Sequence, residues 1–248
     1  PMFEANKRAA TQWPRFAMAI AFAAFISPAP AQPVVPGFNG PPIIANAARI
    51  HPVRAHNGMV VAQEERAAVI GRDILRKGGN AIDAAVATGF ALAVTLPRAG
   101  NIGGGGFMLV HLAKQNKTVA IDYRETAPAD TRPDVFLDAD GNFARRKSQF
   151  SGLGVGVPGT VAGMALAHSK YGSGKFTLAA LLAPAIKLAR DGFHIDEDLA
   201  DSLPRAVRRF SQYPSSRAIF MHANGSALRE GETLVQKDLA QSLERIAT

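Results

Sequence analysis

The residues best suited to chemistry in this sequence lie between positions 97 and 128. A glycine-rich bend at 100–106 leads into an apolar run, and a second apolar run ends at Arg124. Arginine carries a planar fork of donors that grips a carboxylate with two hydrogen bonds, which the point charge of lysine does not. Arg124 is therefore a candidate carboxylate-binding residue. The alternative is a structural ion pair with Asp122 or Glu125.

The glycines at 103–106 invite comparison with a phosphate-binding loop. Such loops stand where a strand turns into a helix, usually with a G-x-G-x-x-G or a Lys-Ser/Thr signature. Here the predicted order is helix, glycines, strand, and no Lys-Ser/Thr pair follows. Because glycine lets another backbone approach closely, the sequence favours a tight entry into a buried strand over a nucleotide site.

The elements that position this stretch follow from hydrophobic spacing. Residues 64–77 carry apolar side chains at helical spacing and stop at two glycines. Residues 81–96 are apolar on all sides, which predicts a helix buried on all sides and packed closely against a sheet. Asn80 and Asp83 before it have the spacing of a capping box. The runs 107–113 and 118–123, joined by a polar turn, predict an antiparallel hairpin.

The other elements are predicted from shorter signals. We expect a short strand at 59–62 and a mobile loop at 145–156. The pattern after residue 156 is rich in helices, predicted at 160–170, 178–191 and 236–247, with another that starts at 196 and is interrupted at Pro204. From the pattern alone the fold class is α+β with layered packing.

Several motifs occur in an order that resembles the large-subunit core of γ-glutamyltransferase, also called γ-glutamyltranspeptidase. They are GGNAIDAAVATGFALAV (78–94), GNIGGGGFM (100–108), DYRETAP (122–128), GVPGTVAGMALAHSKYG (156–172), LARDGF (188–193) and GETLVQKDLAQSLERIA (231–247). The resemblance covers nearly everything after His56. It identifies residues 57–248 as the N-terminal part of a large subunit, an incomplete domain.

The resemblance implies a fold and an activity. The fold is the αββα sandwich of the N-terminal-nucleophile hydrolases. The enzyme transfers the γ-glutamyl group of glutathione or related donors to amino acids, peptides or water through a γ-glutamyl-threonine intermediate. Its precursor cleaves itself, and the freed threonine becomes the nucleophile with its own amine as base. No Thr-rich motif of that kind occurs in these 248 residues, so no catalytic residue is expected here. The C-terminal half, or small subunit, is an expected partner.

The resemblance also implies a role for Arg124. Residues 122–128 match the family motif D-[FY]-R-E-x-A-P, whose arginine holds the α-carboxylate of the γ-glutamyl group. This favours substrate binding over the ion pair. Two alternatives for the function stay open. One is a glutaryl or cephalosporin acylase of the same superfamily, whose substrate carboxylate suits a similar grip. The other is a truncated, non-catalytic fragment.

Composition excludes several classes of site. The net charge is +8, with the densest basic clusters at 145–147 and 205–209, but three Tyr and one Trp are few for base stacking. We therefore expect a basic, solvated surface and no nucleic acid partner. There is no cysteine for disulfides or thiolate metal sites, and the six histidines lie far apart. No metal and no cofactor are expected.

The N-terminus has the pattern of a secretory signal over residues 1–31. Three basic residues precede an apolar run at 16–26, and Ala29 and Ala31 place small residues before a cleavage site at Gln32. The run is shorter than the ~20 residues that span a bilayer, so no stable membrane insertion is expected. Residues 32–56 are rich in Pro and Gly and predict an extended linker. The mature protein is expected to be periplasmic or secreted.

Overall fold

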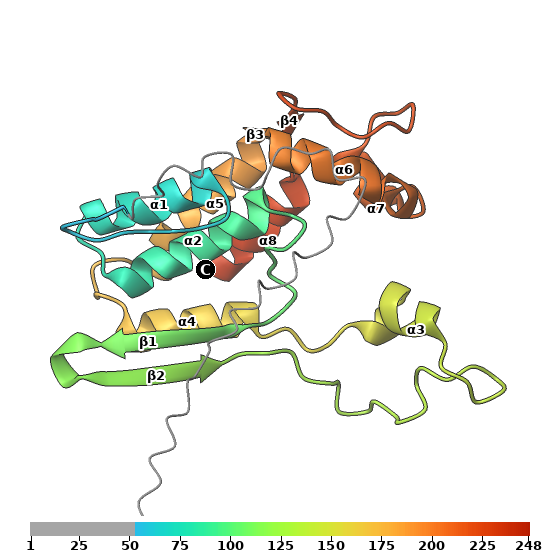
Figure 1. Cartoon of the computed structure of the whole chain (residues 1–248), viewed down its shortest axis with the longest axis horizontal. Helices are drawn as coiled ribbons and strands as arrows, with labels where there is room; N and C mark the ends of the chain where they lie inside the picture. Colours follow the sequence, from blue (N-terminus) through green and yellow to red (C-terminus); the bar gives the residue numbers. More distant parts are fainter. Residues whose placement is uncertain (1–52) are drawn as a thin grey trace, which may run out of the picture. The chain divides into compact units, whose positions relative to one another are not determined.

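The computed structural model describes residues 53–248, so the predicted signal peptide and most of the predicted linker lie outside the described residues. Figure 1 shows the order of the elements and their arrangement. They are α1 (Glu65–Arg76), α2 (Ala81–Thr95), β1 (Phe107–Leu112), β2 (Lys117–Asp122), α3 (Arg145–Phe150), α4 (Thr160–Tyr171), α5 (Leu178–Asp191), β3 (Phe193–His194), α6 (Glu197–Phe210), α7 (Pro214–Phe220), β4 (Thr233–Leu234) and α8 (Lys237–Ala247).

Helix α2 is the buried centre of this part of the chain. Ten of its 15 residues are buried, as its apolar sequence predicts. The predicted packing against a sheet is wrong for the greater part of the helix, because its main neighbours are helices α1, α4 and α5. Small residues permit this close approach: a Cβ on Gly71 of α1 would stand 2.2 Å from Thr88 Oγ1 of α2.

The start of α2 confirms the predicted capping box. Asn80 Oδ1 accepts hydrogen bonds from the backbone N–H groups of Ile82 and Asp83, each at 3.0 Å. The Asp83 carboxylate accepts in return from the Asn80 N–H at 3.0 Å. Asp83 is fully buried, and it also accepts from the Ser173 N–H, at 3.2 Å to Oδ2. The cap therefore joins the start of α2 to the turn that follows α4.

The main core lies among α1, α2, α5, α6 and α8. Its largest buried side chains are Phe90, Leu181, Leu182, Ile195, Leu234 and Leu243. Gln236 is also buried, and its Nε2 donates to the carbonyl oxygen of Val94 at 2.8 Å. This bond satisfies a carbonyl at the end of α2 that no later turn of the helix can reach.

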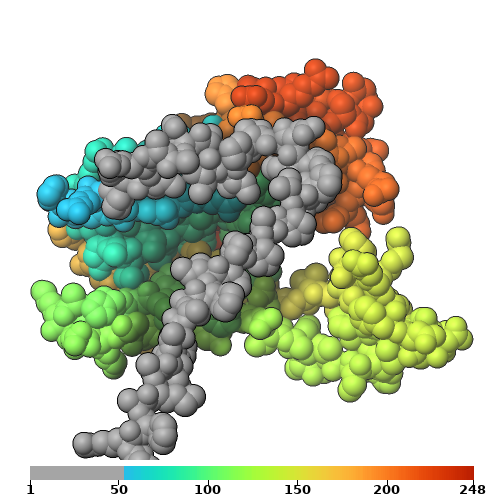
Figure 2. Space-filling model, viewed as in Figure 1, coloured from blue at the N-terminus to red at the C-terminus, as the bar shows by residue number. Residues whose placement is uncertain are grey.

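The predicted hairpin is present, with Phe107 opposite Asp122 and Leu112 opposite Lys117. One face packs on α4 through a small cluster formed by Val110, Ile121 and Ala167. On the other face, Phe107 and Leu109 are 66% and 75% exposed. The prediction of a buried strand is therefore wrong for one face of β1, because none of the described residues covers it. In the space-filling view the hairpin lies at the lower left edge of the described part of the chain (Figure 2).

Three short-range predictions need correction, and two short features were not predicted. Residues 59–62 form no strand, because none of the described residues pairs with them in a ladder. Residues 145–156 form α3 and a 3₁₀ turn rather than a loop. Helix α6 continues through Pro204, since the buried Leu199 and Leu203 anchor it ahead of the proline. Helix α7 and the two-residue pairing of β3 with β4 were not predicted.

Within residues 53–248, no helix is both long enough and apolar enough to span a lipid bilayer.

Candidate functional site

Arg124 stands where the hairpin ends. The ladder continues one pair beyond β1 and β2, since the Tyr123 N–H donates to the Gly106 carbonyl at 3.0 Å. The Asp122 carboxylate then accepts a hydrogen bond from the backbone N–H of Arg124 at 3.0 Å. Asp122 thus fixes the backbone of Arg124 and leaves the guanidinium group for another partner.

The Arg124 side chain is exposed and makes no hydrogen bond or ion pair with any of the residues 53–248. The alternative of a structural ion pair with Asp122 or Glu125 is therefore not observed. Five N–H donors on a planar fork face solvent, where an incoming carboxylate can meet them without breaking an existing contact.

Glycines allow neighbouring backbone segments to pack closely against residues 123–125. A Cβ on Gly105 would stand 2.5 Å from the Tyr123 carbonyl oxygen and 2.8 Å from the Arg124 Cα. A Cβ on Gly159, just before α4, would stand 1.9 Å from the same carbonyl oxygen. We call Gly104, Gly105 and Gly159 the glycine junction. The predicted role of the glycine bend, close approach of another backbone segment, is confirmed at Gly105.

Asn101 ties the glycine junction to α4. Its Oδ1 accepts from the Gly104 N–H at 2.7 Å and from the Thr160 hydroxyl at 3.0 Å. The Gly104 carbonyl accepts in turn from the N–H groups of Gly159 and Thr160, at 2.8 and 3.0 Å. These bonds cap the N-terminus of α4, which carries no side-chain cap of its own. Sequence reasoning missed Asn101 and Thr160, although Asn in a glycine bend is a signal for bonds to the backbone that follows.

Tyr123 anchors the strand exit on α4. A Cβ on Gly163 would stand 2.2 Å from Tyr123 Cγ, so only glycine leaves room for this ring. Burial raises the pKa of the Tyr123 phenol above its ordinary value. Tyr123 is therefore a packing residue, and Arg124 beside it is the polar group that reaches solvent.

This arrangement can bind an anion but shows no nucleophile. Thr160 is buried, and its hydroxyl already donates to Asn101. Within residues 53–248, no group of three or more His, Asp or Glu side chains is arranged to hold a metal ion. The chemistry that the site offers is recognition of a carboxylate by an exposed guanidinium on a rigid base.

The family model described as gamma-glutamyltranspeptidase matches residues 67–248. The chain belongs to this family. The matched range includes the glycine bend and Arg124, and the family resemblance of the sequence is confirmed.

Curated relatives of the family are similar over most of this chain. The glutathione hydrolase proenzyme of Escherichia coli is 52% identical over 198 residues, which are 79% of this chain and 33% of the relative. The glutathione hydrolase proenzyme of Bacillus subtilis is 46% identical over 193 residues, 77% of this chain and 32% of the relative. The chain thus spans about a third of the length of these gamma-glutamyltranspeptidase relatives.

Two solved structures resemble the fold. Gamma-glutamyltranspeptidase of Helicobacter pylori matches with a TM-score of 0.75 and 46% identity, covering 79% of this chain and 56% of the other. A cephalosporin acylase of Bacillus halodurans matches with a TM-score of 0.66 and 30% identity, covering 82% and 38%. The chain is α+β and helix-rich, with the fold that these gamma-glutamyltranspeptidases and acylases share.

Proposed function

We propose that the protein to which this chain belongs is a γ-glutamyltransferase and glutathione hydrolase. It transfers the γ-glutamyl group of glutathione or related donors to amino acids, peptides or water. The observation that carries this proposal is Arg124: its guanidinium is exposed and unpaired among the described residues, on a backbone fixed by Asp122 and the glycine junction. A γ-glutamyl donor carries a free α-carboxylate that matches this fork.

In this mechanism Arg124 binds and orients the donor. Gripping the α-carboxylate with two hydrogen bonds fixes one end of the γ-glutamyl group, so the γ-amide at the other end has few positions to occupy. A threonine from outside this chain attacks the γ-carbonyl carbon, with its own α-amine as base. The C–O bond of the ester forms, the C–N bond breaks, and the leaving amine takes the proton. An amino acid, peptide or water then attacks the ester and releases the threonine.

We also propose that residues 57–248 pack against other parts of the protein. Residues 57–248 belong to an αββα sandwich in which other parts of the protein cover the exposed face of β1. The apolar side chains of Phe107 and Leu109 on that face support this arrangement. The precursor cleaves itself into two subunits, and the isolated chain is inactive because it carries no nucleophile.

Export forms a separate part of the proposal. Residues 1–31 direct the protein to the periplasm or the exterior and are removed before Gln32. N-terminal sequencing of the exported protein checks this directly. A mature protein that still begins with residues of the leader contradicts it.

A second candidate function is hydrolysis of a glutaryl or cephalosporin side chain. The similarity to the Bacillus halodurans cephalosporin acylase favours it, at 30% identity over 82% of this chain. A glutaryl group ends in a carboxylate that Arg124 also suits, but it has no α-amino group. The two functions therefore differ in the contact made to that amine rather than in the contact made by Arg124.

Donor choice by the complete protein separates the two functions. A γ-glutamyl anilide and a glutaryl anilide differ only in the α-amino group, so their kcat/KM ratio measures its recognition. We expect the γ-glutamyl anilide to be preferred by at least about 100-fold, because a site that binds a charged substrate group is left with unpaired partners when that group is absent. A preference for the glutaryl anilide assigns the protein to the acylases.

A further inference from the structure

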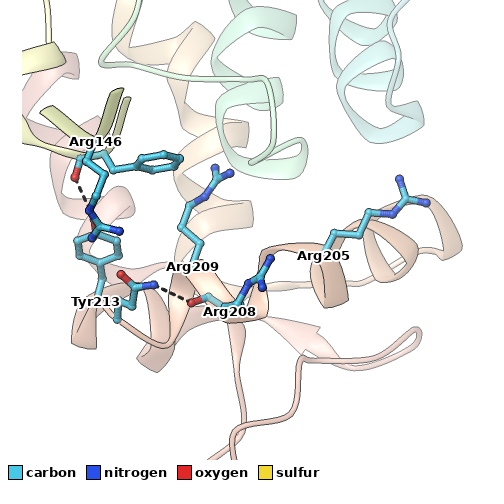
Figure 3. Close-up of a pocket in the computed structure, with 7 residues that line it drawn as sticks. Arg146, Arg205, Arg208, Arg209 and Tyr213 are labelled. Atoms are coloured by element: carbon cyan, nitrogen blue, oxygen red, sulfur yellow. Dashed lines mark hydrogen bonds between the residues drawn. The ribbon is translucent and has the colours of Figure 1, made fainter. Parts of the chain in front are cut away.

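Two basic clusters that lie far apart in the sequence meet in one pocket. Arg146 comes from α3, and Arg205, Arg208 and Arg209 come from the second half of α6 (Figure 3). The pocket has a volume of about 360 Å³. Its lining residues are Arg146, Phe150, Arg205, Arg208, Arg209, Gln212 and Tyr213. The guanidinium of Arg209 lies 5.5 Å from the centre of the Phe150 ring, a cation–π contact between the two helices.

No carboxylate lines this pocket. The acidic residues of α6, Glu197, Asp198 and Asp201, lie in its first half, and Asp198 already pairs with Arg98. None of the four arginines of the pocket forms an ion pair with any of the residues 53–248. Residues 1–52 contain a single carboxylate side chain, that of Glu4. Among residues 53–248, no ion pair therefore balances the charge of these four guanidinium groups.

The walls of the pocket are held together by specific contacts. The Tyr213 hydroxyl donates to the carbonyl oxygen of Phe150 at 3.3 Å, which links the turn between α6 and α7 to the end of α3. Gln212 Nε2 donates to the Arg208 carbonyl at 3.2 Å, which satisfies a carbonyl of the last turn of α6. These bonds use the neutral polar groups of the pocket and leave the guanidinium donors unoccupied.

The C-terminal end of α6 explains the position of only some of the arginines in the pocket. Cations in the last turn interact favourably with the helix dipole, which explains Arg208 and Arg209 without a ligand. Arg205 lies a turn earlier, and Arg146 comes from another helix. Both line the same pocket as Arg208 and Arg209, so an anion bound there is attracted by guanidinium groups from two helices.

We propose that this pocket binds a compact, soluble anion of the phosphate class that carries two or more negative charges, such as a diphosphate group. Guanidinium forks match phosphate oxygens in pairs, and several forks on two helices suit an anion with several oxygens. The volume suits a small molecule rather than an extended polymer. The pocket shares no residue with the Arg124 site, so the inference is independent of the proposed function.

Calorimetric titration of the complete protein with inorganic pyrophosphate tests the inference. Saturable binding that weakens as salt rises is expected. In the double variant Arg146→Gln and Arg208→Gln, which removes one fork from each helix, affinity falls at least about tenfold. The matched control is Arg72→Gln with Arg76→Gln, which removes the same charge from α1 at exposed positions and keeps parental affinity. Arg146→Lys with Arg208→Lys keeps the charge without the forks and gives an intermediate affinity.

Thermal melting of each variant, compared with the parent, shows that a loss of binding is not a loss of folding. Absence of saturable pyrophosphate binding by the parent overturns the inference, as does equal affinity in the pocket variant and the control. Citrate, a multivalent carboxylate, tests the chemical class, and binding as tight as that of pyrophosphate overturns the phosphate assignment. Binding to phosphatidylglycerol vesicles without binding to soluble pyrophosphate overturns it as well, in favour of a lipid surface.

Discussion

At the scale of single residues, Arg124 is positioned by backbone contacts rather than by partners of its own side chain. Asp122 accepts its backbone N–H, and Gly105 allows the glycine bend to lie against its Cα. An arginine held in this way can present its fork to a ligand without first breaking an ion pair. The backbone contacts therefore position the exposed side chain for binding.

Substitution of Gly105 tests this support. A Cβ at Gly105 meets three backbone atoms at 2.5–2.8 Å, so Gly105→Ala must displace the strand exit. We expect the complete protein to lose roughly 1–3 kcal/mol in free energy of unfolding, the usual effect of overpacking. The control is Gly103→Ala, because a Cβ at Gly103 meets nothing within 4 Å. Equal stability of the two variants in denaturant unfolding contradicts the account.

The sequence predicts some of these residues and misses others for a physical reason. Arg124 belongs to a contiguous motif, and the glycine bend is visible in four adjacent letters. The contact between Asn101 and Thr160 joins positions 59 residues apart. Nothing local marks that pairing, because it depends on where α4 packs against the hairpin.

At the scale of elements, the contact between α1 and α2 depends on a missing side chain at Gly71. A Cβ there would lie 2.2 Å from Thr88 Oγ1, which is buried and has no hydrogen-bond partner among the described residues. Gly71→Ala is expected to destabilise the complete protein by roughly 1–3 kcal/mol through overpacking.

A double-mutant cycle identifies the cause of that loss. Thr88→Ala removes the hydroxyl that the new methyl group strikes, so the double variant should recover part of the loss caused by Gly71→Ala. Free energies of unfolding are measured for the parent, both single variants and the double variant. Simple additivity of the two single effects contradicts the proposed clash.

The stability of the protein is expected to depend on pH through Glu232, in the loop before β4. The pKa of Glu232 is lowered, first by the backbone N–H of Arg229 and then by His222. A carboxylate with a lowered folded-state pKa contributes stability above its unfolded value, and this stability is lost as the pH falls through the folded-state pKa. Glu232→Gln should therefore lower the melting temperature at pH 7. The effect should be smaller at a pH below the folded-state pKa of Glu232, where the carboxyl group is protonated. An equal effect at every pH contradicts this.

The sequence predicts the bounds of helices well where the periodic apolar pattern is long. The bounds of α5 match the expected 178–191, and α8 begins one residue after the expected 236, because periodic apolar positions and end signals agree there. Residues 59–62 have the composition of a strand but no described partner for a ladder. Residues 145–156 contain few apolar positions, so the helix α3 within them carries little periodic signal.

At the scale of the whole molecule, the exposed face of β1 predicts the behaviour of residues 57–248 alone. Phe107 and Leu109 leave apolar surface in water, which favours association. We expect the isolated chain to aggregate and to show no turnover of a γ-glutamyl anilide. A soluble monomer with a sharp thermal transition contradicts the first expectation, and steady turnover contradicts the second.

Paired substitutions locate the cause of that aggregation. Phe107→Ser with Leu109→Ser should reduce aggregation of the isolated chain, measured by light scattering, and destabilise the complete protein, where other parts are proposed to cover this face. The control is Lys114→Ser with Gln115→Ser in the exposed turn of the same hairpin. Equal effects of the two pairs contradict a covered β1 face.

Arg124 is proposed to grip the α-carboxylate of a γ-glutamyl donor. Arg124→Lys keeps the charge and loses the fork. A hydrogen bond to a charged group contributes roughly 1.5–3 kcal/mol, so kcat/KM for a γ-glutamyl anilide should fall about tenfold to a hundredfold. Self-cleavage, followed on a gel, should survive because it needs no donor. Arg132→Lys is the control, since Arg132 is exposed and pairs with Asp134.

The most direct measurement compares two donors in the complete protein. A γ-aminobutyryl anilide lacks the α-carboxylate and keeps the amine and the reacting amide. We predict that Arg124→Lys lowers kcat/KM for the γ-glutamyl anilide and leaves the slower turnover of the γ-aminobutyryl anilide unchanged. Parental kcat/KM for the γ-glutamyl anilide in a normally cleaved Arg124→Lys variant, or an equal loss on both donors, contradicts it.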